Sequence, residues 1–376
     1  MFGAALAVGM KMNKILSTFS LMCLWLIAQN ILYADETSSS TAFPASSLFL
    51  TSIAQAGARL VSVGERGTVL LSDDDGKSWS THQAGTMDTL TAVTFQNDTQ
   101  GFAVGHGGNI LKTVDGGSSW KSVLDGKKLI SLTTKAASQA LAQFDKDQDV
   151  SADDADHFQA YAKRLEENGT SEPLFSIKFM NESLGFAVGA YGMILRTRDA
   201  GETWAVWMTH VDNPQELHLY TILETNGAIY LAGEQGFLAR SLDGGEHFTR
   251  LETGFAGSFF TLAADKRSTL YAGGLQGQLI ASSDQGTSWR KVETDSNISW
   301  IASQLDEQGN VILGNLAGGL YTVKDSKIQS IPQPDKAPLS DFVTDGKVNI
   351  ITVGALGSQT VIINPNPLPE PSNGSL

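Results

Sequence analysis

Short apolar segments alternate with glycine-rich turns along the chain from Ser47 onward. Within the unit from Thr89 to Asp125, four segments follow one another as TLTAVTFQ, GFAVG, NILKTV and WKSVL. Each segment has the length of a β-strand, and Gly, Asn and Asp occupy the turns between them. The pattern predicts units of four short antiparallel strands.

One phrase of about sixteen residues recurs in these units and is clearest from Gly105 to Trp120, as GHGGNILKTVDGGSSW. It combines a Gly-x-x-Gly turn, a strand and an Asp box of the form [Ser/Thr]-x-Asp-x-Gly-x-x-Trp. The first glycines of seven phrases lie at 64, 105, 189, 233, 273, 314 and 354. All gaps are near forty residues except the one between 105 and 189, and the last two phrases lack the Asp box.

A four-stranded sheet cannot bury both of its faces alone, so repeated sheets of this kind must stack around an axis. We therefore predict an all-β fold, a seven-bladed β-propeller of four-stranded antiparallel blades over residues 35–363. The first strand of each unit is predicted to be innermost. The seventh unit shows no fourth strand after Ile363, and residues before Leu48 could supply it.

The repeated phrases resemble two known groups of propellers. The Asp boxes resemble the BNR repeats of sialidase-like propellers. The longer phrase, with FAVG before it, is similar to the photosystem II stability/assembly factor-like family of extracytoplasmic propellers, over roughly residues 47 to 363. This resemblance implies a role in assembly or stability of a membrane complex. For photosynthetic members it also implies a basic surface patch, whereas only Arg66 is basic on the predicted rim of this chain.

The Asp boxes are interpreted as structural, because they recur in the blades whereas a catalytic centre occurs once. Each Asp can accept hydrogen bonds from backbone N–H groups of its own turn, and each final aromatic ring is predicted to be buried between sheets. The residues concerned are Asp74, Trp79, Asp115, Trp120, Asp199, Trp204, Asp243, Phe248, Asp284 and Trp289.

No catalytic residues can be assigned from the sequence. Sialidase-like chemistry would require three converging arginines and an Arg-Ile-Pro motif, but arginines are sparse and the motif does not occur. His210 and His218 match no zinc spacing. We predict a protein that is not an enzyme, and a carbohydrate-active propeller, either sialidase-like hydrolase or lectin, remains the alternative.

The long gap between phrases contains a different pattern. Residues 127–172 have helix-forming composition, with apolar residues three and four apart, and predict a helical hairpin between blades 2 and 3. Chain crossings between blades share a face with the Gly-x-x-Gly turns, so the insertion should lie beside a polar rim that binds a partner. The predicted rim consists of Glu65, Arg66, His106, Tyr191, Glu234, Gln235, Gln276 and Asn315.

The run between the two predicted helices, DKDQDVSADDAD, resembles an EF-hand loop. Its calcium ligands would be Asp145, Asp147, Asp149, Asp153 and Asp156. Val150 replaces the usual glycine of such a loop, and Asp156 replaces the usual glutamate. An acidic helix-capping loop without metal is the alternative, and no other cofactor is predicted.

The composition and the N-terminal sequence indicate the cellular compartment and the classes of partner. The chain has 376 residues and a net charge of -14, with 40 acidic against 26 basic residues, which excludes a nucleic-acid partner. Residues 1–34 have the pattern of a signal peptide, with an uncleaved anchor as the alternative. Cys23, the only cysteine, follows the large Met22, which does not suit lipid modification. We predict a periplasmic protein that is a monomer by itself, with a flexible Pro-rich tail at 364–376.

These observations together predict a non-enzymatic periplasmic binding, assembly or accessory factor. Its expected partner is a membrane protein or envelope complex, which docks on the propeller rim and the helical insertion.

Overall fold

The computed structural model describes residues 48–144, 152–170, 172–324, 327–333, 335–344 and 349–362. The chain divides into two units, Met1–Ala42 and Phe43–Leu376, and every described residue belongs to the second unit. The signal peptide, Cys23 and the tail at 364–376 lie outside the described residues, so these predictions stay predictions.

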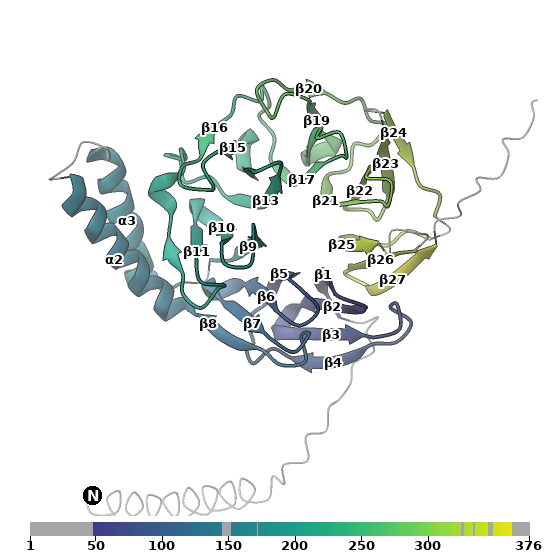
Figure 1. The fold of residues 1–376 in the computed structure, drawn as a ribbon, viewed down its shortest axis with the longest axis horizontal. Helices are drawn as coiled ribbons and strands as arrows, with labels where there is room; N and C mark the ends of the chain where they lie inside the picture. The colour runs from purple at the N-terminus through teal and green to yellow at the C-terminus, as the bar shows by residue number, and fades with distance from the viewer. Residues whose placement is uncertain are drawn as a thin grey trace, which may run out of the picture. The chain divides into compact units, whose positions relative to one another are not determined.

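Seven antiparallel sheets surround a central axis in the second unit (Figure 1). The first sheet holds β1 (Leu50–Ala56), β2 (Arg59–Gly64), β3 (Thr68–Ser72) and β4 (Ser80–Gln83). The second holds β5 (Leu90–Phe95), β6 (Gly101–Gly105), β7 (Ile110–Thr113) and β8 (Lys121–Leu124). The third holds β9 (Leu174–Phe179), β10 (Gly185–Gly189), β11 (Ile194–Thr197) and β12 (Ala205–Val206).

The remaining sheets continue the same order. The fourth holds β13 (Leu219–Thr225), β14 (Ala228–Gly233), β15 (Leu238–Ser241) and β16 (Thr249–Arg250). The fifth holds β17 (Phe259–Ala264), β18 (Leu270–Gly274), β19 (Leu279–Ser282) and β20 (Arg290–Lys291). The sixth holds β21 (Trp300–Leu305), β22 (Val311–Asn315), β23 (Leu320–Lys324) and β24 (Lys327–Ser330). The seventh holds β25 (Leu339–Thr344), β26 (Asn349–Gly354) and β27 (Gly357–Ile362).

The predicted seven-bladed propeller is confirmed, with the first strand of each sheet nearest the axis (Figure 1). The seventh sheet differs from the others, because the described residues give it three strands. The described chain ends at residue 362, directly at the end of β27, and begins at residue 48. A fourth strand supplied by residues before Leu48 therefore lies outside the described residues.

Asp-box glycines allow each blade to approach the one before it. A Cβ added to Gly201 of the third blade would lie 2.3 Å from the Phe102 ring of the second, and one added to Gly245 of the fourth would lie 2.2 Å from the Phe186 ring of the third. Both rings are fully buried. The glycine is thus required by packing between blades as well as by its positive φ.

The structure shows the hydrogen bonds predicted for the Asp boxes. In the box of the fifth blade, Asp284 accepts hydrogen bonds from the Ser288 N–H at 2.9 Å and the Ser288 hydroxyl at 2.6 Å. The Trp289 indole N–H donates to the Gly286 carbonyl at 3.1 Å. The prediction that these rings are buried between sheets is confirmed for two boxes and holds in part for the other three, where the indole bond keeps one ring edge at the turn. Trp204 and Phe248 are buried, whereas Trp79, Trp120 and Trp289 are half-buried.

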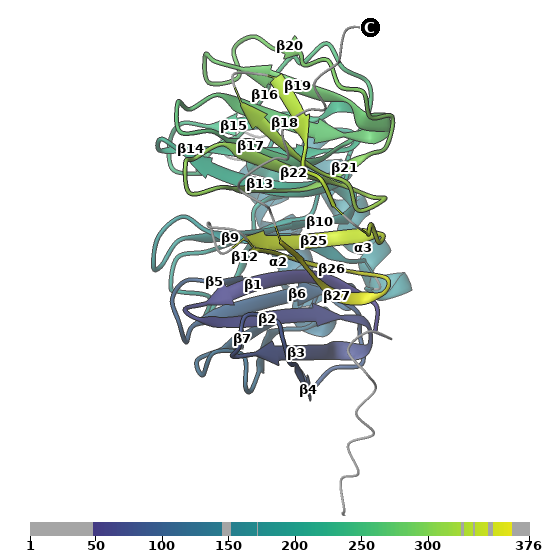
Figure 2. The ribbon, with the colours of Figure 1, turned by 90° about the vertical axis from the view of Figure 1, so that its right-hand side faces the viewer.

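The ring closes through contacts between the first and seventh sheets. Figures 1 and 2 both show β25–β27 beside β1–β3. Apolar side chains of the two sheets form one buried cluster, which includes Leu50, Leu70, Ile351 and Val353. The Asp341 carboxylate of β25 also accepts a hydrogen bond from the Ser52 hydroxyl of β1 at 2.8 Å.

The predicted insertion is a pair of helices, α2 (Gly126–Phe144) and α3 (Ala152–Asn168), between the second and third sheets. Asp125 caps α2, because its side chain accepts the Lys128 N–H at 2.9 Å. Buried residues of both helices join a cluster with β6, β7 and β9–β11 on the outer side of the ring (Figure 1). Neither helix is long and apolar enough, within the described residues, to cross a membrane.

Gln276 and Gly277, neighbours in the Gly-x-x-Gly turn of the fifth blade, are predicted to differ in how far their substitution lowers stability. The Gly277→Ala variant should lose more than about 2 kcal/mol of unfolding free energy, because its Cβ would lie 1.9 Å from the Ser296 carbonyl oxygen at a positive φ. Gln276→Gly should change it by less than about 1 kcal/mol, because its side chain is exposed and a φ of 56° suits glycine. Chemical denaturation of both variants measures the contrast, and equal losses would contradict it.

Candidate interaction face and central channel

The Gly-x-x-Gly turns and the loops between consecutive blades share one face of the propeller, here named the Gly-x-x-Gly face. Hydrogen bonds connect the two kinds of segment. The Gly67 N–H donates to the Asp88 carbonyl at 2.9 Å, and the Gly108 N–H donates to the Glu172 carbonyl at 3.2 Å. Antiparallel order puts the Asp boxes at the opposite ends of the strands.

Seven of the eight predicted rim residues have exposed or half-buried side chains on this face: Glu65, Arg66, His106, Tyr191, Glu234, Gln235 and Gln276. The prediction for Asn315 was wrong, because it is 2% exposed. Its side-chain oxygen accepts the N–H groups of Ala317 and Gly319 at 3.2 and 2.8 Å, which holds the turn from inside. Leu316 is exposed in its place.

The apolar character of this face does not follow from the repeat pattern. Ten large apolar side chains are exposed in the described part of the chain, and six of them lie on the Gly-x-x-Gly face: Phe49, Met87, Tyr191, Leu275, Leu316 and Leu356. Met87 is the most exposed of all, at 74%. One feature of the sequence could have indicated it. Large apolar residues occur within turns and blade-to-blade loops, where the alternating strand pattern does not call for them.

The insertion meets this face through the Arg164 cluster, which consists of Arg164, Tyr161, Tyr191, Glu172 and Glu216. The Arg164 guanidinium lies 4.8 Å from the Tyr161 ring centre and 4.4 Å from the Tyr191 ring centre. It also pairs with Glu172 at 3.5 Å and Glu216 at 3.7 Å. Burial raises the pKa of Glu216, and the Arg164 charge opposes that rise.

The insertion was predicted to lie beside the whole rim, and the structure corrects this. It lies outside the ring next to the second and third sheets (Figure 1). It therefore reaches the turns of His106 and Tyr191, where Leu129 of α2 approaches Gly108 and Arg164 of α3 contacts Tyr191. Its helices are amphipathic, and their apolar sides are used to cover these two blades.

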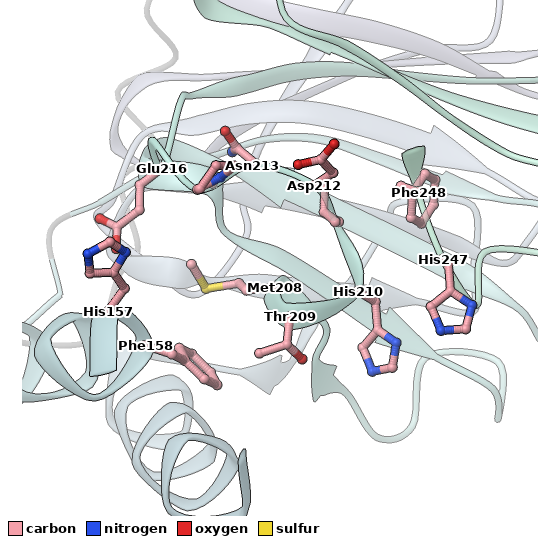
Figure 3. Close-up of a pocket in the computed structure, with 13 residues that line it drawn as sticks. His157, Phe158, Met208, Thr209, His210, Asp212, Asn213, Glu216, His247 and Phe248 are labelled. Atoms are coloured by element: carbon pink, nitrogen blue, oxygen red, sulfur yellow. The ribbon is translucent and has the colours of Figure 1, made fainter. Parts of the chain in front are cut away.

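A cavity of about 360 Å³ separates α3 from the loop that follows β12 (Figure 3). His157 and Phe158 face it from α3, and His210 and His247 line its other side. The His210 ring stacks on Trp207 at 3.5 Å between ring centres, and burial, followed by the charge of His247, lowers the pKa of His210. Within the described residues, no group of three His, Cys, Asp or Glu side chains is placed to hold a metal ion.

A β-bulge near the start of each inner strand shapes the central channel. In every sheet the pairing with the next strand skips the second residue of the inner strand. All seven skipped residues line a cavity of about 790 Å³, and they are Thr51, Thr91, Phe175, Tyr220, Phe260, Ile301 and Ser340. A bulge redirects a side chain, so the bulges decide which side chains of the inner strands line the channel near this face.

Three of these residues form what we call the aromatic crescent: Phe175, Tyr220 and Phe260. They belong to three consecutive blades. The ring centres of Phe175 and Tyr220 are 5.3 Å apart, and those of Tyr220 and Phe260 are 5.2 Å apart. All three rings are half-buried. The rest of the described lining is mainly hydroxyl, amide and aliphatic, and it contains no arginine.

Asp341 is an unusual group in this lining because it carries a charge at the junction of the seventh and first blades. It accepts the Ser52 hydroxyl at 2.8 Å, the Ile53 N–H at 3.1 Å and the Phe342 N–H at 2.8 Å. Burial outweighs these hydrogen bonds and raises the pKa of Asp341 to about 6.

The predicted calcium ligands are only partly described. Asp145, Asp147 and Asp149 lie outside the described residues, and Asp153 and Asp156 fall in the first turns of α3. Asp156 is exposed. Calcium binding stays a prediction.

Comparisons with known proteins confirm the resemblance to the photosystem II assembly factor-like propellers. Residues 162–257 match the family model described as photosynthesis system II assembly factor YCF48. The photosystem II assembly lipoprotein Ycf48 of Synechococcus sp. (strain CC9902) is 29% identical over 109 residues. That alignment covers 28% of this chain and 32% of the relative, so the chain aligns with about a third of that protein.

Solved structures of YCF48 are among those that share the fold. A structure of YCF48 bound to D1 peptide superposes with a TM-score of 0.58 and 16% identity, over 85% of this chain and 94% of the other. YCF48 from Cyanidioschyzon merolae superposes with a TM-score of 0.61 and 14% identity, over 84% and 96%. At this level of identity the likeness shows the propeller fold alone.

The position of Asp341 predicts a pH effect on stability. The folded protein holds the Asp341 proton more tightly than the unfolded chain, where the pKa is near the ordinary 3.8. This group therefore stabilises the fold below pH 4, and that contribution is lost as pH rises through 6. The melting temperature of Asp341→Asn minus that of the parent should increase between pH 5 and pH 7.5. A difference that is constant over this range would contradict the assignment.

The predicted calcium loop can be tested by titration calorimetry. We expect calcium to release or absorb heat with the parent protein, and the Asp145→Ala plus Asp147→Ala variant to lose that signal because two carboxylate ligands are removed. No heat with the parent, or equal heat with both proteins, would exclude the site.

Proposed function

We propose that this protein is a non-enzymatic accessory or assembly factor that docks on a membrane protein complex through its Gly-x-x-Gly face. The observation that carries the proposal is the concentration of exposed apolar side chains there. Apolar side chains exposed on a rigid surface are typical of protein interaction sites. The similarity to photosystem II assembly factors supports the general role of an assembly factor for a membrane complex.

The proposal places the propeller outside the cytoplasm. It is supported by the predicted signal peptide at 1–34 and by the name of the Synechococcus relative, which is a lipoprotein. We infer a periplasmic location for this chain.

The partner is proposed as a class and not as a particular complex. D1 peptide is the ligand of a neighbouring structure with 16% identity. The basic patch expected of photosynthetic members is replaced here by a rim that includes Glu65 and Glu234 beside Arg66. A partner complex whose docking surface is basic would be attracted to this acidic rim. A partner that is recognised by a basic patch on the propeller would not be.

A second candidate function, carbohydrate binding, is favoured by one observation. The aromatic crescent lies at the channel mouth, and aromatic rings at such a position can stack on sugars. The hydrolase form of this alternative has less support, because the described channel lining contains no arginine to hold a sialic acid carboxylate.

Charged substitutions on opposite faces test the docking proposal. The Met87→Glu plus Leu275→Glu variant should lose most of its capture of membrane proteins, because charges on the Gly-x-x-Gly face would need to be desolvated at the interface. The matched control is Val114→Glu plus Leu242→Glu, which changes two exposed apolar residues of the Asp boxes. The measurement is quantitative pull-down from detergent-solubilised membranes with mass spectrometry.

Equal capture by the parent and both variants would overturn the proposal, and so would selective loss in the Asp-box control. Point variants are preferred to deletion of residues 127 to 172. Buried Phe158 and Leu165 of the insertion pack in one cluster with the blades, so a deletion would expose core surface. Melting temperatures of all variants confirm that the fold is retained.

A further inference from the structure

The aromatic crescent has a carboxylate beside it. Glu234 occupies the Gly-x-x-Gly turn of the fourth blade, and its side chain accepts the His218 N–H at 3.3 Å, two residues before Tyr220. Burial raises the pKa of Tyr220, and the negative charge of Glu234 adds to that rise. Among the described residues, no Lys or Arg pairs with Glu234.

The crescent is restricted to one side of the channel mouth. At the corresponding bulge positions of the remaining blades the chain has Thr51, Thr91, Ile301 and Ser340. Thr51 and Thr91 have a structural task, because their hydroxyls bond to carbonyl groups of the next blade, Leu90 and Leu174 respectively. Phe175 and Phe260 have no hydrogen-bonding group, and within the described residues the Tyr220 hydroxyl bonds to no carbonyl. The His218 ring packs beside the crescent, 6.4 Å from the Phe175 ring centre and 6.2 Å from that of Tyr220.

The same chain already holds guanidinium groups with aromatic rings and carboxylates. Arg164 lies between two tyrosine rings and pairs with Glu172 and Glu216. Arg196 lies 3.2 Å from the Trp207 ring centre and pairs with Glu246 at 3.0 Å. The crescent and Glu234 repeat this combination, but no cation of the described chain lies over the three rings.

The orientation of the rings favours a cation over a flat sugar. Neighbouring rings of the crescent are tilted by 52°, so they form a curved wall and not one open platform. Curved aromatic walls with a nearby carboxylate are suited to a positive group, which is attracted to ring faces and to the carboxylate together. The net charge of -14 draws the same class of ligand.

We propose that the aromatic crescent and Glu234 bind a basic side chain, guanidinium or ammonium, presented by the membrane partner. The inference rests on the docking function proposed above and specifies the kind of partner side chain that the channel mouth binds. A basic residue at the tip of a partner loop would enter the channel mouth while the apolar residues around it contact the partner surface.

The test uses the whole mature protein and two short peptides followed by NMR or calorimetry. The probes are acetyl-Gly-Arg-Gly-amide and the same peptide with citrulline, which has nearly the shape of arginine and no charge. We expect the arginine peptide to bind at least about fivefold more tightly than the citrulline peptide. Glu234→Gln and Phe260→Leu should each reduce that binding by a similar factor, because each removes one part of the site.

Glu307→Gln is the matched control, because Glu307 is an exposed carboxylate in the turn between β21 and β22, away from the Gly-x-x-Gly turns. It should leave binding of the arginine peptide unchanged. Equal binding of both peptides, or equal effects of Glu307→Gln and Glu234→Gln, would overturn the proposal. So would tighter binding of N-acetylglucosamine oligomers that is lost in Phe260→Leu and kept in Glu234→Gln, which would identify a sugar site.

Failure of this inference can be separated from failure of the docking function. If Glu234→Gln and Phe260→Leu bind no less arginine peptide than the parent, while the Met87→Glu plus Leu275→Glu variant still loses membrane capture, docking stands and the crescent has another use. Loss of folding is checked by the melting temperature of each variant.

Discussion

Burial of both faces of every sheet is the constraint on which the rest of this structure depends. The second and third strands of the first five blades are almost wholly buried, as in β10 and β11, so these sheets need a neighbour on both sides. Close approach is possible because the Asp-box glycines leave room for rings such as Phe102 and Phe186. A ring of seven satisfies every sheet only when the last contacts the first, and Leu50, Leu70 and Ile351 provide that contact. The Asp boxes are therefore packing devices, and the opposite face is left for variation.

The fold could be predicted from the sequence because its determinants are local and repeated. Strands, turns and Asp boxes recur with a period near forty residues, and helices α2 and α3 fall within the one long gap. The predictions that were wrong concern turns that depart from the repeat. Asn315 stands at a rim position by alignment, but it pairs with Trp300 as Gly64 pairs with Leu50, so it holds the place of the first glycine of its turn. Its amide therefore bonds inside the turn. In the fifth blade the structural turn begins after Gly274 and not after Gly273.

The candidate site was less predictable for a related reason. The bulge in each inner strand shifts which side chains face the channel, and sequence alternation alone does not reveal the skipped residue. Phe175, Tyr220 and Phe260 therefore read as ordinary strand aromatics. The exposed apolar residues of the Gly-x-x-Gly face are present in the sequence, but their exposure depends on turn and loop conformation, as at Tyr191, which has a left-handed φ of 53°. The proposed docking function accordingly depends on residues that differ between repeats, while the repeats keep the backbone of this face fixed.

The central claim is that the Gly-x-x-Gly face, and not the Asp-box face, contacts a membrane partner. Site-specific photo-crosslinking in intact cells tests it most directly, with a photoreactive amino acid at position 87 or 275 compared with position 114 or 242. The account predicts high-mass adducts with membrane proteins from positions 87 and 275 alone. Adducts from positions 114 and 242 of equal or greater yield would contradict it.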